Sequence, residues 1–230
     1  MSEMLSELHP VVILIFALLV AIILKAVPFL AYPFRLFFTM IHEMGHVFAV
    51  RLTGGEVIRF KIERDGSGVA SFRGGEGLII TPAGYLGTAV FSAILIMLSG
   101  FPDIARLSLG TVAGLFMLLV VLYGHASCLT VTVGLAFGAG LLWVGWNAPT
   151  FWSVFLLNLL AILGGLTSLD DLRQLRWGVR YRAWLGRDDA SQMAQRVGCS
   201  PIFWATVWFL FSVVMIGAAI WLTWFRGVLG

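Results

Sequence analysis

Charged residues are scarce in this chain of 230 residues: they make up 12% of it, against about 25% in an ordinary soluble domain, while hydrophobic residues make up 60%. This composition excludes a soluble globular enzyme. Cysteine is scarce too, and Cys128 and Cys199 provide neither a disulfide framework nor a cysteine-rich metal site. No basic residue precedes Lys25, so the amino end lacks the positive region of a secretory signal peptide. We therefore expect the first apolar run to be retained as a helix.

Long apolar runs fill most of the sequence, and a helix needs about 20 such residues to cross a bilayer. They predict an all-α polytopic membrane protein with about seven transmembrane helices, forming one integral membrane domain over residues 1–230. The second run is the most polar, and Pro28 and Pro33 are expected to break the chain between the first two runs. The predicted spans are 10–31, 34–52, 77–99, 105–123, 126–146, 150–169 and 202–225.

Two charged segments interrupt the apolar pattern. Residues 53–76 contain two short runs typical of strands, 57–62 and 69–72, joined by the turn sequence Asp-Gly-Ser-Gly at 65–68. These features predict a small β-hairpin at the membrane edge. Residues 170–200 hold six arginines and four aspartates, with no apolar run long enough to span. We expect this second segment to be an extramembrane loop, helical in part.

The distribution of lysine and arginine indicates the topology. Seven spans would place the amino terminus, the 53–76 hairpin and the 170–200 loop on the same face of the membrane. That face would hold eleven of the 15 lysines and arginines, and the opposite face would hold the other four, Lys25, Arg35, Arg106 and Arg226. By the positive-inside rule the hairpin and the loop are expected to be cytoplasmic. The compact length favours a bacterial inner membrane. The net charge of +3 is thus explained by basic residues in cytoplasmic segments, and we expect no nucleic-acid partner.

The motif His-Glu-Met-Gly-His at residues 42–46 carries the chemistry. On a helix, His42 and His46 lie on one face and can converge on one metal ion, while Glu43 can reach a water on that metal as general base. Zinc would lower the pKa of that water toward about 7 and polarise a peptide carbonyl. The alternative is a hydrogen-bonded polar cluster that only ties helices together. Polar groups are costly inside a membrane, which favours the functional interpretation.

A catalytic zinc ion takes three protein ligands, so a third ligand must come from elsewhere in the chain. Asp170 and Asp171 lie at the predicted cytoplasmic end of the sixth span, at a depth that matches His46. Both are candidates, although a solvated helix end is the alternative for them. His9 and His125, at the ends of other spans, are more typical of interfacial or packed histidines.

The sequence resembles the site-2 protease family of intramembrane zinc metalloproteases, and in particular its compact, peptidase-like branch. The resemblance begins with the HEMGH motif and the glycine-turn hairpin that follows it. It continues through the sequence Thr-Pro-Ala-Gly-Tyr-Leu-Gly and an Asp-Ala segment, and it ends with a Pro and Trp entry to the last helix. These blocks lie at residues 42–46, 60–69, 81–87, 189–194 and 199–204.

The resemblance implies a ligand set and a catalytic base. His42 and His46 would be zinc ligands, Glu43 the base, and the third ligand an aspartate from a later helix. The larger family's Leu-Asp-Gly block favours Asp170, whereas the compact branch's pattern of Asp before an aliphatic residue favours Asp171. Asp189 is a further candidate, for which a loop position favours a structural or interfacial role.

Together these observations predict an intramembrane zinc endopeptidase that cleaves membrane-protein substrates within or beside their transmembrane segments, with the lipid bilayer as its environment. One alternative is an inactive, protease-like scaffold with a structural metal site, which the intact Glu43 argues against. The other is a metal-ion carrier, which would need polar groups across the remaining spans. The hairpin is expected either to hold an unwound substrate by strand addition or to cover the site.

Overall fold

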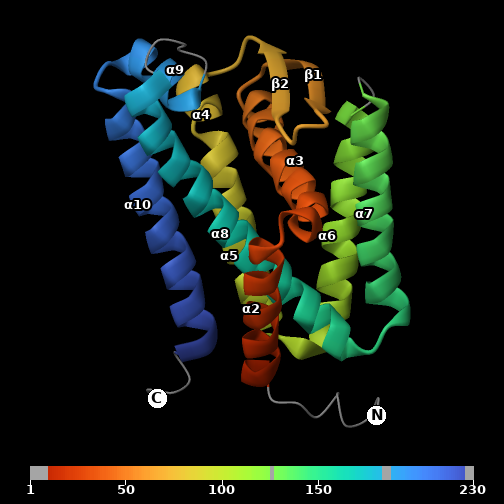
Figure 1. Cartoon of the computed structure of the whole chain (residues 1–230). Coiled ribbons are helices and arrows are strands. Elements are labelled where there is room, and N and C mark those ends of the chain that lie inside the picture. The colour runs from red at the N-terminus through yellow and green to blue at the C-terminus, as the bar shows by residue number, and fades with distance from the viewer. Residues whose placement is uncertain (1–9, 125–126, 183–187, 226–230) are drawn as a thin grey trace.

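The computed structural model describes residues 10–124, 127–182 and 188–225. Within them the fold is a helical bundle with one small sheet (Figure 1). The long helices pack side by side, and a hairpin and two short helices lie together at one end of the bundle. The described elements are α2 (Pro10–Ala26), α3 (Pro28–Leu52), β1 (Glu56–Ile62), β2 (Gly68–Arg73), α4 (Gly77–Ile80), α5 (Ala83–Ser99), α6 (Pro102–Tyr123), α7 (Cys128–Asn147), α8 (Thr150–Arg182), α9 (Asp189–Val197), α10 (Pro201–Ile220) and the π-helix η2 (Trp221–Phe225).

The first two predicted spans form one bent pair, α2 and α3, with an angle of 105° between them. Val27 separates the helices in an extended conformation (φ −117°, ψ 93°), as expected for the residue before Pro28. Pro28 begins α3, and Pro33 is accommodated inside it. The break therefore lies earlier than the sequence pattern indicates, and α3 starts before the predicted boundary at residue 34.

The predicted count of seven spans is not confirmed. Among the described residues, four helices are long and apolar enough to cross a membrane, or five if the bent pair counts as one span. α5 has 17 residues, about 25 Å of helix, against about 30 Å for the hydrocarbon core. The mostly helical fold and the small antiparallel sheet agree with the prediction.

The two ends of the bundle differ in character. The hairpin, α4, α9 and the carboxyl end of α3 lie at one end, whereas the start of α2 and the end of α10 lie at the other (Figure 1). The amino terminus was expected on the hairpin's face. The start of α2 lies at the opposite end because α2 and α3 together make a single passage along the bundle. In the segment expected to be a loop, α8 continues to Arg182 and α9 forms a separate helix.

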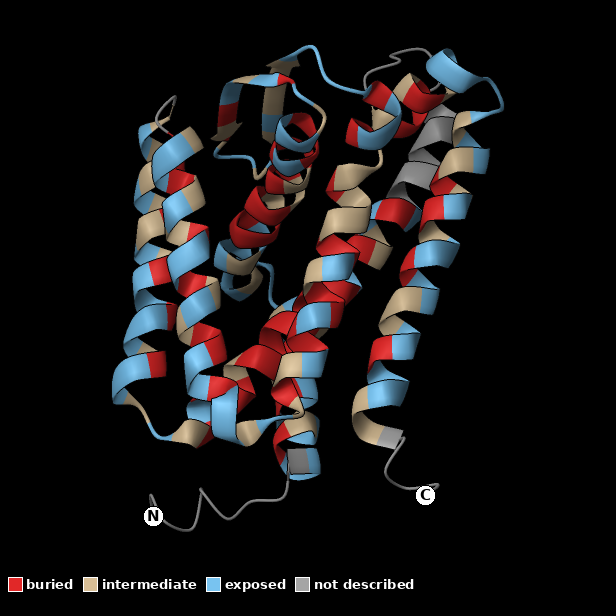
Figure 2. Ribbon diagram, turned by 180° about the vertical axis from the view of Figure 1, so that it is seen from behind, coloured by how far each residue is buried: buried red, intermediate tan, exposed pale blue. Residues whose placement is uncertain are grey.

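α8 is the central helix of the bundle. Of the four candidate spans it is the most buried, and it packs against α2, α5, α6 and α10. The outer helices α6, α7 and α10 expose many apolar side chains along their length, among them Trp143, Trp146 and Val214 (Figure 2). A bundle with an apolar exterior is suited to lipid, where the hydrocarbon chains take the place of water.

The hairpin is fixed to α3 by its turn. β1 and β2 pair antiparallel, and Gly66, with φ +85°, allows the tight connection between them. The Tyr32 hydroxyl donates to the Arg64 carbonyl oxygen at 2.7 Å, and Thr39 Oγ1 donates to the Gly66 carbonyl oxygen at 2.9 Å. Both donors belong to α3. The hairpin therefore lies along the same helix that carries the HEMGH motif.

Candidate active site

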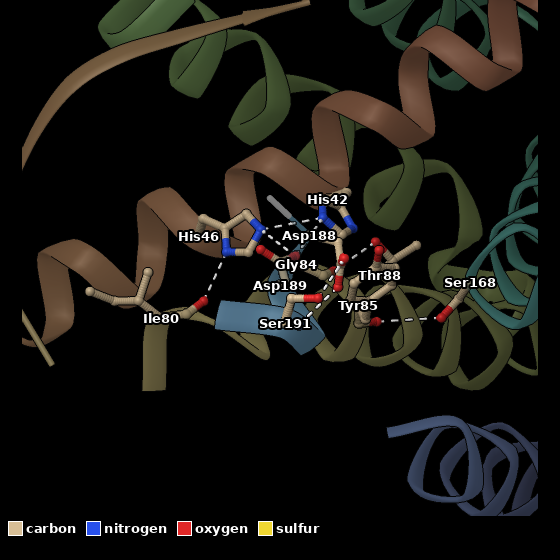
Figure 3. Close-up of polar contacts among 10 residues, drawn as sticks. All are labelled: His42, His46, Ile80, Gly84, Tyr85, Thr88, Ser168, Asp188, Asp189 and Ser191. Carbon is tan, nitrogen blue, oxygen red and sulfur yellow. Dashed lines mark hydrogen bonds and ion pairs between the residues drawn. The ribbon is translucent and has the colours of Figure 1, made fainter. Parts of the chain in front are cut away.

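His42 and His46 lie one turn apart on α3 and direct their Nε2 atoms toward each other, 3.3 Å apart (Figure 3). His46 Nδ1 is 2.8 Å from the Ile80 carbonyl oxygen. Because a carbonyl oxygen only accepts, Nδ1 donates its proton to Ile80, and Nε2 is the ring nitrogen that faces the pocket. A backbone acceptor on the second ring nitrogen is the usual support of a metal-bound histidine.

Asp189 completes a cluster of three potential ligand atoms. Its Oδ2 is 3.6 Å from His42 Nε2 and 3.4 Å from His46 Nε2, and its side chain is largely buried. Burial alone would raise the pKa of the Asp189 carboxyl. The hydrogen bonds and charges of His42 and His46 outweigh burial and hold that pKa well below its usual range. The carboxylate is therefore ionised at neutral pH, as a metal ligand must be.

The spacing of these three atoms fits a zinc ion. Zinc bound tetrahedrally at about 2.0–2.2 Å by nitrogen and oxygen keeps its ligand atoms roughly 3.3–3.6 Å apart. The three separations here are 3.3, 3.4 and 3.6 Å. Two imidazoles and one carboxylate also form a donor set used by catalytic zinc, with a fourth position left open. Among the described residues, these three form a potential metal-binding group.

Glu43 lies beside this cluster in the same pocket, which has a volume of about 330 Å³. It is 8% exposed, and the Ala70 backbone N–H donates to its carboxylate. Ala70 belongs to β2, whose free edge faces the pocket while β1 pairs with its other edge. Gly68, also on β2, lies directly against the Glu43 side chain. The hairpin thus forms one wall of the site and orients the carboxylate.

Glycine lets α5 approach the cluster. A Cβ atom built on Gly84 would lie 2.5 Å from His46 Nε2 and 2.6 Å from His42 Cε1. Real Cβ atoms do not come so close to other heavy atoms. Gly45, on the opposite side of this contact, packs against the Ala83 carbonyl oxygen. The first turn of α5 therefore forms the floor of the site.

The predicted aspartate ligands are placed differently from Asp189. Asp170 forms an ion pair with Lys25 at the end of α2. Asp171 lies near enough to act electrostatically on His42, yet it does not belong to the ligand group found among the described residues. The sequence predicts Asp170 or Asp171 as the third metal ligand, whereas the group found in the structure has Asp189 in that place. His9 and His125 lie outside the described residues.

The reason for the difference is the path of the chain after α8. α9 folds back over the pocket and packs on α8 and α10 through a cluster formed by Leu172, Ala190, Met193, Ala205 and Trp208. Asp189 is the first residue of this helix. One sequence signal was available: Asp188 followed three residues later by Ser191 at the start of an amphipathic stretch indicates a helix N-terminus. This pattern predicts that Asp189 lies in the first turn of a helix and not in a loop.

Asp188 holds the start of α9 in place, which leads to a testable prediction. Its Oδ1 accepts from the Ser191 backbone N–H and its Oδ2 from the Ser191 hydroxyl, both at 2.8 Å. Asp188→Ala removes this cap, worth about 1 kcal/mol, and we expect roughly fivefold weaker zinc binding in a competitive titration. Asp188→Asn retains a capping oxygen and should bind zinc within about twofold of wild type.

Ser127→Ala is a matched control, because it removes an N-cap hydrogen bond to Thr130 from α7, far along the chain from α9. It should leave zinc affinity unchanged. Equal weakening by Ser127→Ala and Asp188→Ala would contradict a specific role for Asp188 in placing Asp189.

Comparison with known proteins identifies the family of this chain. The model of the peptidase M50B-like family matches residues 15–219, which is most of the chain and includes the HEMGH helix, the hairpin, α5 and α9. No curated protein and no solved structure gave a match. The chain belongs to the peptidase M50B-like family, part of the site-2 protease family of intramembrane metalloproteases.

Proposed function

We propose that the protein is an intramembrane zinc endopeptidase that hydrolyses peptide bonds within or beside transmembrane segments of membrane proteins. The observation that carries this proposal is the convergence of His42, His46 and Asp189 in one pocket with Glu43. A structural metal site needs ligands only. An oriented carboxylate beside the ligands, but outside the ligand group, is what hydrolysis requires.

The residues present have distinct roles in this proposal. His42, His46 and Asp189 would hold Zn²⁺, which supplies a Lewis acid to polarise the peptide carbonyl and acidify water. Glu43 would take a proton from the attacking water as the water oxygen bonds to the carbonyl carbon. The same carboxyl group would then pass the proton to the amide nitrogen as the carbon–nitrogen bond breaks.

The hairpin supports a substrate in extended form. β2 is paired on one edge only, and Gly68, Ala70 and Phe72 on its other side line the pocket. A transmembrane segment must unwind to be cleaved, which exposes backbone groups that need partners in an apolar environment. A strand laid along β2 would satisfy them and bring its peptide bond next to Glu43.

The charge distribution supports an orientation. The hairpin and the segment from Asp170 onward hold most of the lysines and arginines. We propose that this end of the bundle faces the cytoplasm, in a bacterial inner membrane, and that water reaches the site from that side.

The proposed activity can be tested without a known substrate. Wild type and Glu43→Gln would be expressed in a bacterial host, and new protein amino termini in the membrane fraction would be quantified by mass spectrometry. We expect termini that map to transmembrane segments with wild type and not with Glu43→Gln, because the amide cannot accept the proton. Matching sets of termini at equal expression would contradict the proposal and favour a scaffold with a structural metal.

A further inference from the structure

A hydrogen-bond donor in the pocket would add to the Lewis acid in stabilising the carbonyl oxygen of the peptide bond, which gains negative charge as water adds. Carboxylates only accept, and the two histidines are occupied as potential ligands. Among the lining residues, Gln192 carries a donor amide but already has a partner, and the hydroxyl groups belong to Thr81 and Tyr85. Neither residue acts in the mechanism described so far.

Tyr85 is held rigidly against the ligand cluster. Its ring contacts the His42 imidazole edge to face, with centroids 4.6 Å apart, and stacks on Trp208 of α10 with centroids 5.9 Å apart. Its backbone carbonyl accepts from Ser168 Oγ of α8 at 3.3 Å. Gly84, the preceding residue, touches both histidines. Three helices therefore fix the ring beside a ligand, which is the preorganisation that transition-state stabilisation needs.

The Tyr85 hydroxyl is free to serve as a donor. Within the described part of the chain it forms no hydrogen bond, although the residue lines the pocket. The carboxylates of Asp189, Asp188, Asp171 and Glu43 all act on the phenol electrostatically, so the ring lies at the acidic centre of the site. A phenol keeps its proton at neutral pH. Its O–H group can therefore donate to an oxygen of the substrate.

We propose that the Tyr85 hydroxyl is a catalytic group that donates a hydrogen bond to the carbonyl oxygen of the scissile peptide bond as water adds to the carbonyl carbon. The phenol keeps its proton throughout, so the proton balance remains that of Glu43. This inference rests on the proposed hydrolysis and adds a residue to it. Because the hydrogen bond strengthens as charge develops, its removal should affect kcat and not KM.

Tyr85→Phe removes the oxygen and keeps the ring contacts with His42 and Trp208. Cleavage of fluorescently labelled casein, an unfolded polypeptide, would be measured in detergent micelles together with the zinc content of each variant. We expect kcat to fall about 10²-fold or more, KM to stay within about twofold, and zinc to remain at the wild-type level. Thr81→Val, which removes the other hydroxyl of the pocket, should keep kcat within about threefold of wild type.

The outcomes separate the inference from the proposed function. If wild type cleaves and Tyr85→Phe has the same kcat, the inference is overturned while the proposed function stands. The inference is also overturned if zinc is lost in step with activity, which indicates a packing role, or if Thr81→Val shows the larger loss. If zinc-loaded wild type cleaves neither casein nor proteins of the membrane fraction, the proposed function fails, and the inference fails with it.

Discussion

Gly84→Ala is expected to abolish stoichiometric zinc binding while the helical bundle still assembles. The added methyl carbon would lie 2.5 Å from His46 Nε2 and closer still to His42 Nε2, the two atoms that would bind the metal. The clash is with side-chain ends and not with backbone, so the imidazoles can rotate away without unfolding the protein. That rotation breaks the ligand set. Zinc content by mass spectrometry, with circular dichroism to verify the fold, would measure both parts of the prediction.

Gly217→Ala is the matched control, since Gly217 is also a helical glycine but has open space where its Cβ would be. It should keep about one zinc ion per chain. A Gly84→Ala protein that also keeps full zinc occupancy would show that the ligand atoms do not lie against α5, which would contradict the geometry of the site.

Gly68→Ala is expected to have the opposite pattern, with zinc retained and cleavage lost. A Cβ on Gly68 would lie 2.5 Å from Glu43 Cγ, 2.6 Å from its Oε1 and 2.8 Å from the Thr39 methyl carbon Cγ2. The flexible carboxylate can move aside at little cost in stability, but a displacement of about 1 Å in a reacting group can lower the rate roughly 10²-fold. We expect a fall in kcat of that order, with zinc content unchanged, in the casein assay.

Ser71→Ala tests whether this effect is specific, because Ser71 lies on the same strand and does not line the pocket. Its activity should match that of wild type. Loss of zinc in Gly68→Ala, or equal loss of activity in Ser71→Ala, would mean that β2 supports the fold generally and does not position Glu43.

The parts of this site that sequence could predict are those set by local spacing. His42, Glu43 and His46 share a helical turn, so their proximity follows from the 3.6-residue period alone. The hairpin follows from strand alternation around Asp65-Gly66. Both features depend on residues close together in the chain. For the same reason Pro28 predicts the break between the first two helices. It does not predict that these two helices together make a single passage along the bundle.

The parts that sequence could not predict depend on distant segments. Asp189 reaches the histidines only because α9 folds back and packs its Ala190 and Met193 against α8 and α10. Asp170, which the sequence predicts to lie at the same depth in the membrane as His46, is paired with Lys25 instead. Charges buried near each other find partners by three-dimensional packing, which a hydropathy pattern does not record. Tyr85 likewise gains its place beside His42 from helix packing and not from a local motif.

The most direct test of the central claim is the zinc content of the detergent-purified protein, measured by mass spectrometry on wild type and five variants. We expect about one zinc ion per chain in wild type, Glu43→Gln, Asp170→Ala and Asp171→Ala, and its loss in His46→Ala and Asp189→Ala. Retention in Asp189→Ala with loss in Asp170→Ala or Asp171→Ala would place the third ligand on α8. Folded wild-type protein that takes up no zinc when it is supplied would contradict the account altogether.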